Sequence, residues 1–277
     1  MTVVLGLLAA VFYGVADFVG GLASRQRSAV TVLLHSYPVG AVLMVIMLPL
    51  FPGHVDGRVI VFGTLGGLSG LIGVIIMYSL MAQAPMNIIS PVTAVLAAIV
   101  PVVVGVLIGE RPRPSAWFGI AVGIGAVILV SRTNEDHPHG KIALRVLALA
   151  FVSGIGFGFY FVFLARAGQH SGLWPLVVSR FASALLIIPI AQQRRAASAI
   201  RRRLLAVVAL AGACDAGANM CFLLAARHGL LSLAGVLTSL YPAVTVMLAV
   251  GLLHEHTSRV QRVGLALAAT SIVLITI

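Results

Sequence analysis

The chain has 277 residues, of which 60% are hydrophobic and 9% are charged. A soluble domain needs about a quarter of its residues charged to cover its surface, so the composition excludes a soluble enzyme, a disordered protein and a fibrous repeat. The formal net charge is +11, but the basic residues lie in short loops between apolar runs. This pattern is typical of membrane loops at an anionic face and predicts no nucleic-acid partner.

Apolar runs long enough to cross a bilayer, about 20 residues each, follow one another along the whole chain. Ten are expected, at residues 2–22, 30–50, 59–81, 86–108, 115–131, 143–165, 173–191, 203–226, 229–252 and 259–276. The first run has no basic segment before it and further spans follow it, so we expect a span rather than a cleaved signal peptide. The sequence therefore predicts an all-α, polytopic protein with ten transmembrane helices in the lipid bilayer of a bacterial inner membrane.

The distribution of lysine and arginine predicts the orientation, because cytoplasmic loops carry more of both. Twelve lie in loops that follow odd-numbered spans and five in loops that follow even-numbered spans. The cluster from Arg194 to Arg203 contributes most of the difference. This count predicts cytoplasmic odd-numbered loops and places both termini outside.

An internal repeat relates the two halves of the chain at an offset of 145 residues. Gly-Glu at 109–110 aligns with His-Glu at 254–255, and the run at 118–131 matches the run at 263–276 in its pattern of apolar and small residues. Each half then holds five spans, and an odd number of spans inserts the second copy upside-down relative to the first. This is the inverted repeat of secondary transporters, which bind their substrate near the midplane.

The repeat divides the chain into two units of five helices. We expect the first repeat at 1–131, a polar linker at 132–142 and the second repeat at 143–277.

These motifs resemble a known family. The residues that carry the resemblance are Gly109-Glu110-Arg111 and Gly119 in the first half, and Ser239-Leu240-Tyr241-Pro242, Thr245, Glu255, Gln261 and Gly264 in the second. The chain resembles the drug/metabolite transporter superfamily, in the branch built from two EamA domains. It departs from that pattern at Ala97, at Pro101 and at His254. The resemblance implies transport of a small organic metabolite or drug, and it implies cytoplasmic termini, opposite to the charge count; both orientations stay open.

Three charged residues lie well inside the expected spans: Asp17, Arg180 and Asp215. Each costs about 2.5–3.5 kcal/mol at that depth, so such residues usually face a cavity or a partner. Substrate contact or proton coupling is one interpretation. A structural ion pair or a hydrogen bond between helices is the other.

Asp17 follows Tyr13 by one helical turn, so both lie on one face of the first helix. At its depth we expect His35 or Tyr37 of the second helix as its partner. A carboxyl–imidazole pair could relay protons near neutral pH. A hydrogen bond that only fixes the packing of two helices is the alternative.

The second half supplies the other two charged positions. Asp215 has Asn219 one turn later, which makes a polar stripe in the eighth helix, whereas its repeat counterpart is Gly70. Arg180 aligns with about Tyr37 and could bind a substrate carboxylate or phosphate. Snorkelling to the membrane interface is the alternative for Arg180.

Hydroxyl groups complete the candidate site. Tyr241 with Pro242 is expected to break the ninth helix near its centre, and broken helices are the best sequence indication of a transporter site. The full set of expected substrate-binding residues is Tyr13, Asp17, Tyr78, Tyr160, Arg180, Asp215, Asn219, Thr238 and Tyr241.

Small and acidic residues predict helix contacts. Glycines at 63, 66, 67, 70 and 73 favour close packing of the third helix, and those at 119, 123 and 125 could form a dimer face on the fifth. Glu110 and Glu255 are each expected to cap the next helix. Cys214 and Cys221 are expected to be small buried hydrophobes.

No motif for catalysis, a metal site or a cofactor stands out, so we expect no enzyme and neither metal nor cofactor. The favoured function is a secondary transporter that works by alternating access, as a monomer or homodimer, with proton coupling and the direction of transport, including export, left open. A lipid-handling or structural membrane protein is the alternative. A multidrug exporter would need a cavity rich in aromatics around a carboxylate, which the 7% aromatic content disfavours.

Overall fold

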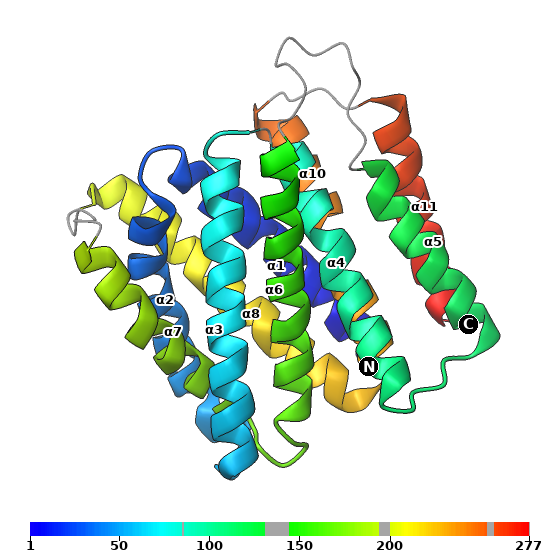
Figure 1. Cartoon of the computed structure of the whole chain (residues 1–277), viewed down its shortest axis with the longest axis horizontal. Coiled ribbons are helices and arrows are strands. Elements are labelled where there is room, and N and C mark those ends of the chain that lie inside the picture. Colours follow the sequence, from blue (N-terminus) through cyan, green and yellow to red (C-terminus); the bar gives the residue numbers. More distant parts are fainter. Residues whose placement is uncertain (85, 131–143, 194–199, 254–257, 277) are drawn as a thin grey trace.

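The computed structural model describes residues 1–84, 86–130, 144–193, 200–253 and 258–276, and every regular element in these ranges is a helix. The first half contains α1 (Thr2–Ser24), α2 (Ala29–Met47), the 3-10 helix η1 (Leu48–Leu50), α3 (Gly57–Met81), α4 (Met86–Leu107) and α5 (Pro114–Val130). The second half contains α6 (Leu144–Arg166), α7 (Trp174–Gln193), α8 (Arg202–His228), α9 (Leu231–Thr238), α10 (Tyr241–Leu253) and α11 (Arg259–Thr276). These bounds agree closely with the ten expected spans (Figure 1). The expected linker at 132–142 lies outside the described residues.

The ninth expected span is two helices. Helix α9 ends at Thr238, and α10 begins at Tyr241, so the predicted break is confirmed. Pro242 is the second residue of α10, where its missing N–H costs no helical hydrogen bond.

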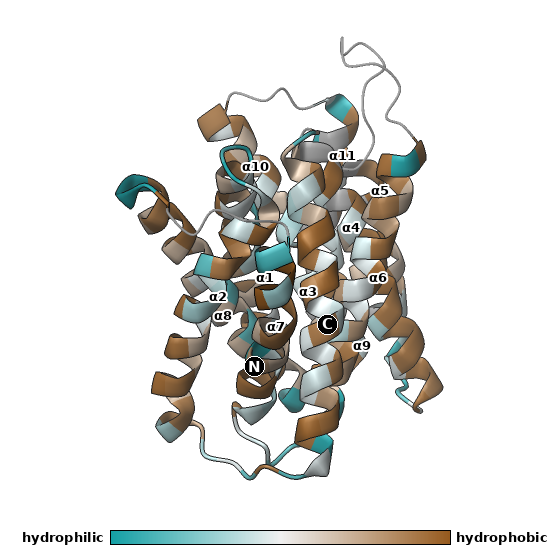
Figure 2. Cartoon of the chain, turned by 60° about the vertical axis from the view of Figure 1, so that its left-hand side comes forward, coloured by the Kyte–Doolittle hydropathy of each residue, from teal (hydrophilic) through white to brown (hydrophobic). Residues whose placement is uncertain are grey.

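The outer surface of the bundle suits lipid. Seven helical segments among the described residues are long and apolar enough to cross a membrane, judged by length and composition. Large apolar side chains point outward along them: Leu185 is 77% exposed and Met247 is 65% exposed. In Figure 2 the hydrophilic residues gather at the ends of the helices and in the interior, while hydrophobic residues cover much of the outside.

Each half packs mainly on the other half, and equivalent helices make equivalent contacts. Helix α1 packs on α8, and its counterpart α6 packs on α3; α2 packs on α8 and α7 packs on α3 in the same way. Two glycines mark this equivalence, because a Cβ at Gly67 would overlap the carbonyl oxygen of Ser179, and one at Gly212 would overlap that of Ser36. Each glycine lets the backbones of two helices touch. The close packing expected along the third helix is therefore present in α3.

The glycine face of α5 is used inside the chain. Ser271 of α11 donates a hydrogen bond of 2.7 Å to the carbonyl oxygen of Gly119, and a Cβ at Gly123 would lie 2.7 Å from the same hydroxyl. Helix α11 therefore packs on Gly119 and Gly123, whereas a Cβ at Gly125 would meet nothing within 4 Å, so a dimer face on this helix stays a prediction.

Both termini lie at the same end of the bundle, the lower end in Figure 1. Thr2 lies there against Gly229, in the connection from α8 to α9. We call this end, where α1, α3 and α9 begin and α4, α8 and α11 finish, the terminus-side end.

Candidate functional site

A buried ion pair lies in the middle of the bundle. The Nη2 atom of Arg180, on α7, donates to Oδ2 of Asp215, on α8. The arginine side chain is only 6% exposed and the aspartate 26%. Neither charge could remain alone in lipid, so each makes the burial of the other tolerable.

An aromatic ring covers the guanidinium. The central carbon of Arg180 lies 4.4 Å from the centroid of the Tyr37 ring of α2. A cation held over a ring face is attracted by the π electrons, by about 2 kcal/mol when water is excluded. Since Tyr37 is roughly the repeat counterpart of Arg180, equivalent positions of the two halves meet at this point.

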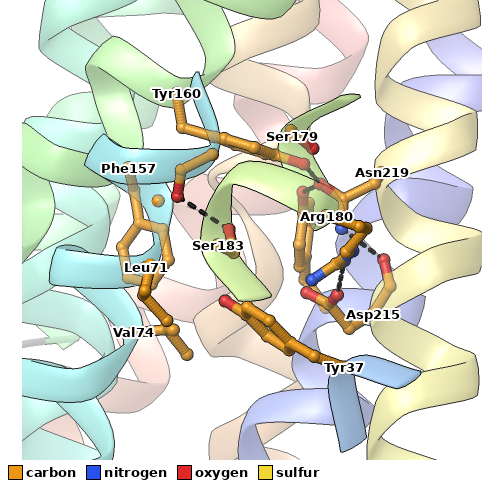
Figure 3. Close-up of a pocket in the computed structure, with 13 residues that line it drawn as sticks. Tyr37, Leu71, Val74, Phe157, Tyr160, Ser179, Arg180, Ser183, Asp215 and Asn219 are labelled. Carbon is orange, nitrogen blue, oxygen red and sulfur yellow. Dashed lines mark hydrogen bonds and ion pairs between the residues drawn. The ribbon is translucent and has the colours of Figure 1, made fainter. Parts of the chain in front are cut away.

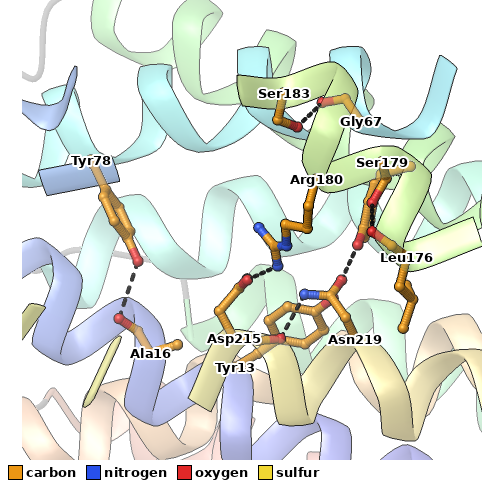
Figure 4. Close-up of polar contacts among 11 residues, drawn as sticks. Tyr13, Ala16, Gly67, Tyr78, Leu176, Ser179, Arg180, Ser183, Asp215 and Asn219 are labelled. Atoms are coloured by element: carbon orange, nitrogen blue, oxygen red, sulfur yellow. Dashed lines mark hydrogen bonds and ion pairs between the residues drawn. The ribbon is translucent and has the colours of Figure 1, made fainter. Parts of the chain in front are cut away.

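Asn219 joins three helices beside the ion pair (Figure 4). Its side-chain oxygen accepts hydrogen bonds from the hydroxyls of Tyr13 on α1, at 2.7 Å, and Tyr160 on α6. Its amide nitrogen donates at 2.6 Å to the backbone oxygen of Asp215. Because the amide uses both its donor and its acceptor, its orientation is fixed.

These side chains form one wall of a cavity of about 30 Å³. Leu71 and Val74 of α3 and Phe157 of α6 line the opposite side, as Figure 3 shows. Gly70 contributes by its small size, because a Cβ there would lie 2.8 Å from the ring of Tyr160. The volume suffices for roughly two water molecules, and residues from both halves line this small space.

Five of the expected substrate-binding residues meet at this cavity: Tyr13, Tyr160, Arg180, Asp215 and Asn219. The sequence did not single out Phe157, Ser179 or Ser183, which also line it, and it assigned Tyr37 only as a partner for Asp17. The repeat contained the signal for Tyr37, because that position aligns with Arg180.

Four expected residues are absent from the cavity lining: Asp17, which is described below, Tyr78, Thr238 and Tyr241. The hydroxyl of Tyr78 donates to the carbonyl oxygen of Ala16 at 3.1 Å. Tyr241 shares a hydrogen bond of 3.0 Å with Thr93, which joins α10 to α4, and Thr238 is buried at the end of α9. The broken helix thus packs against α4 and α1 rather than lining this space.

Asp17 is buried in α1, and the pairing expected for it is wrong. Tyr37 lies against Arg180, and Nδ1 of His35 lies 2.9 Å from the carbonyl oxygen of Thr31. Among the described residues no hydrogen bond joins Asp17 to either. The physical reason is that α1 packs mainly on α8 of the other half and barely touches α2, its neighbour in sequence.

Glu110 caps a helix of the opposite half. Its Oε1 accepts from the backbone N–H of Leu231 at 2.5 Å, and its Oε2 from that of Ser232 at 3.0 Å. The expectation that it caps the next helix, α5, is wrong, because the tertiary fold brings the start of α9 to this carboxylate. Glu255 lies outside the described residues.

The remaining expected features concern sulfur and metal. Cys214 and Cys221 are free and buried, as expected. Within the described ranges, no group of three or more His, Cys, Asp or Glu side chains could hold a metal ion.

Comparison with known proteins bears on the family and the fold. The model of the EamA-like transporter family matches residues 1–132 and again 144–277. A solved crystal structure of a protein superposes with a TM-score of 0.77 at 18% sequence identity, over 99% of this chain and 96% of that one. This likeness shows a common fold. No curated protein matches the sequence significantly.

Proposed function

Because the chain belongs to the EamA-like transporter family, we propose that it is a secondary transporter that moves a small organic solute across a cell membrane through its central cavity. The two family matches, one in each half, support two repeated units, and the long apolar helices support a multi-pass membrane protein.

The ion pair inside the cavity carries this proposal. A membrane protein that only packs against lipid would be stabilised by replacing Arg180 and Asp215 with apolar side chains, since a buried pair rarely repays its desolvation. A charged pair that faces an internal space offers a donor and an acceptor to a polar solute. This favours a solute carrier over a lipid-handling or structural protein.

Alternating access accounts for the small size of the cavity. Helix α1 starts at the terminus-side end and α6 starts at the opposite end (Figure 1), which supports an inverted relation between the repeats. In such folds one repeat rocks against the other around a central site. The cavity holds only roughly two waters, so entry of a solute requires that the halves separate at one end.

Asp17 is our candidate for proton coupling. Asp215 is compensated by Arg180, whereas Asp17 is 6% exposed and no cation is paired with it among the described residues. A buried carboxyl in such a setting can bind and release a proton as the surrounding helices move.

A thermal-stability screen of the purified protein tests the proposal. Amino acids, nucleosides, sugars and cationic drugs are added separately, and a compound that binds the folded state raises the melting temperature by an amount that grows with the logarithm of its concentration relative to its dissociation constant. Tyr160→Phe and Asp215→Asn should abolish the shift. Ser153→Ala is the matched control on the same helix, because it removes a buried hydrogen bond to Gly73 outside the cavity and should retain the shift.

Flux into vesicles, measured with the compound found in the screen, completes the test. Asp17→Asn should retain binding and lose the dependence of flux on a pH gradient. If no soluble compound shifts the melting temperature, the result contradicts a solute carrier and favours the lipid-handling or structural alternative. If Tyr160→Phe and Ser153→Ala behave alike, the cavity is not the binding site.

One observation favours a second candidate, a multidrug exporter. Aromatic rings from Tyr13, Tyr37, Phe157 and Tyr160 line the same cavity as Asp215, and a site for cationic drugs combines aromatic rings with a carboxylate. The guanidinium on that carboxylate opposes it, because it would repel a cation. Cationic drugs in the same screen, with no response to the other classes, would decide for the exporter.

A further inference from the structure

Glu110 supplies the cap that α9 lacks locally. The residue before α9 is Leu230, which has no polar side chain, and α9 receives no cap from it. The first N–H groups of a helix need acceptors, and a carboxylate there also meets the positive end of the helix dipole. Both oxygens of Glu110 serve this role from the other half of the chain.

The turn after α4 aims the carboxylate at α9. Gly109 has a φ of +96°, a conformation that glycine adopts without strain. The N–H of Glu110 then donates at 2.9 Å to the carbonyl oxygen of Gly105, and a Cβ at Gly105 would overlap the carboxylate. Gly109 and Glu110 together therefore form a hydrogen-bonded link between the two halves.

The bridge holds the end of a helix that lines the cavity. Helix α8 carries Asp215 and Asn219, ends at His228, and is joined to α9 by Gly229 and Leu230. A carboxylate that fixes the first turn of α9 to the end of α4 therefore also fixes the terminus-side end of α8.

Other contacts between the halves meet at the same end. The N–H of His54, before α3, donates at 3.0 Å to the carbonyl oxygen of His170, before α7. Beside it a Cβ at Gly53 would overlap the backbone at Gly172. These contacts use backbone atoms, whereas Glu110 joins the halves with a charged side chain that a substitution removes cleanly.

We propose that Glu110 is a positioning residue that holds the terminus-side end of the cavity closed, and that its two hydrogen bonds to α9 break when the cavity opens toward that end. This inference rests on the proposed alternating access and goes beyond it by naming the contact that closes one end. The test needs no substrate, so it can succeed or fail independently of the solute screen.

A reporter cysteine in the cavity measures opening. Ser183→Cys is placed in a chain with Cys214 and Cys221 changed to alanine, and the full-length protein is reconstituted into sealed vesicles. An impermeant maleimide added outside labels the reporter through whichever end faces out. Parallel vesicles with Arg113→Cys, exposed between α4 and α5 at the terminus-side end, give the fraction of molecules with that end outward.

Glu110→Ala should raise the labelling rate from the terminus side roughly tenfold, because a cap across the interface favours the closed state by about that factor. Glu110→Gln retains one acceptor and should give an intermediate rate. Asp56→Ala is the matched control, since Oδ1 of Asp56 caps α3 within its own half through Val59 N–H at 2.8 Å. It should change the rate by less than about twofold.

Equal rates for Glu110→Ala and the unchanged chain would overturn the proposal, as would an equal rise with Asp56→Ala, which would indicate general loosening. Ser232→Pro is a second test that leaves Glu110 unchanged, and it keeps the proposal testable if the glutamate variants fail to fold. It removes one of the two N–H donors at a helix position that accepts proline, and it should raise the rate in the same direction. An unchanged rate in a folded Ser232→Pro chain would also count against Glu110.

Discussion

At the residue scale, the ion pair of Arg180 and Asp215 shows how charge is tolerated inside this bundle. Each charge is compensated by the other, and Tyr37 and Asn219 supply the ring face and the backbone contact that complete the arrangement. Removing one charge of the pair should destabilise the fold far more than removing both. Removal of one partner leaves an uncompensated buried charge, whereas removal of both leaves apolar surface.

Asp215→Asn should therefore lower the free energy of unfolding by about 3–5 kcal/mol, because it leaves the Arg180 guanidinium buried without its counter-charge. The double variant Arg180→Met with Asp215→Leu should recover most of this loss, because no charge remains. Melting temperatures of the purified chains in detergent measure both. A double variant less stable than Asp215→Asn alone would show that the pair contributes net stability.

At the element scale, glycines decide how closely the helices approach. Gly67 and Gly212 are equivalent positions of the repeat, and each faces a backbone carbonyl of the helix packed against it. The same contact therefore occurs twice in the chain, between α3 and α7 and between α8 and α2. A side chain at either position would separate two helices that place cavity residues.

Gly67→Ala and Gly212→Ala should each destabilise the fold by about 1–3 kcal/mol, the usual cost of overpacking. Gly251→Ala in α10 is the control, because a Cβ there meets nothing within 4 Å, and a helical alanine should be neutral or stabilising by up to about 1 kcal/mol. Thermal unfolding of the three variants gives the comparison. Similar melting temperatures for all three would mean that the helices can shift apart at no cost.

At the scale of the whole molecule, the two halves are interleaved. Helix α1 packs most closely on α8, α6 on α3, and α5 on α11, so the main helix contacts cross between the repeats. The cavity and the Glu110 cap are both products of this interleaving, since each takes residues from both halves. An even number of spans also returns the chain to the end where it began.

Tags on the two termini should consequently be cleaved from the same face of sealed vesicles by an added protease. The experiment also decides between the charge count, which places the termini outside, and the family resemblance, which places them in the cytoplasm. Cleavage of the two tags from opposite faces would contradict the ten-span topology. Arg113→Cys labelling provides the control for orientation, because it lies at the same end.

Several residues of the candidate site could be predicted from the sequence, because burying a polar group in an apolar helix costs free energy. Arg180, Asp215 and Asn219 stand out because polar groups in apolar helices are costly and must have partners. Their partners were harder to identify. The sequence suggested His35 or Tyr37 for Asp17 and the next helix for Glu110, and both expectations assumed that neighbours in the chain are neighbours in space.

The sequence by itself predicted the apolar helices, their limits and the break before Tyr241, as the structure has them, because hydrophobicity, proline and glycine act locally along the chain. Only the tertiary structure decided which polar groups meet: Arg180 with Asp215 and Tyr37, Asn219 with two tyrosines, and Glu110 with α9. Apolar helices of similar composition can pack in many orders. The order is selected by close glycine contacts and by pairing of buried polar groups between helices, at separations from 35 positions for Arg180 with Asp215 to 206 for Tyr13 with Asn219.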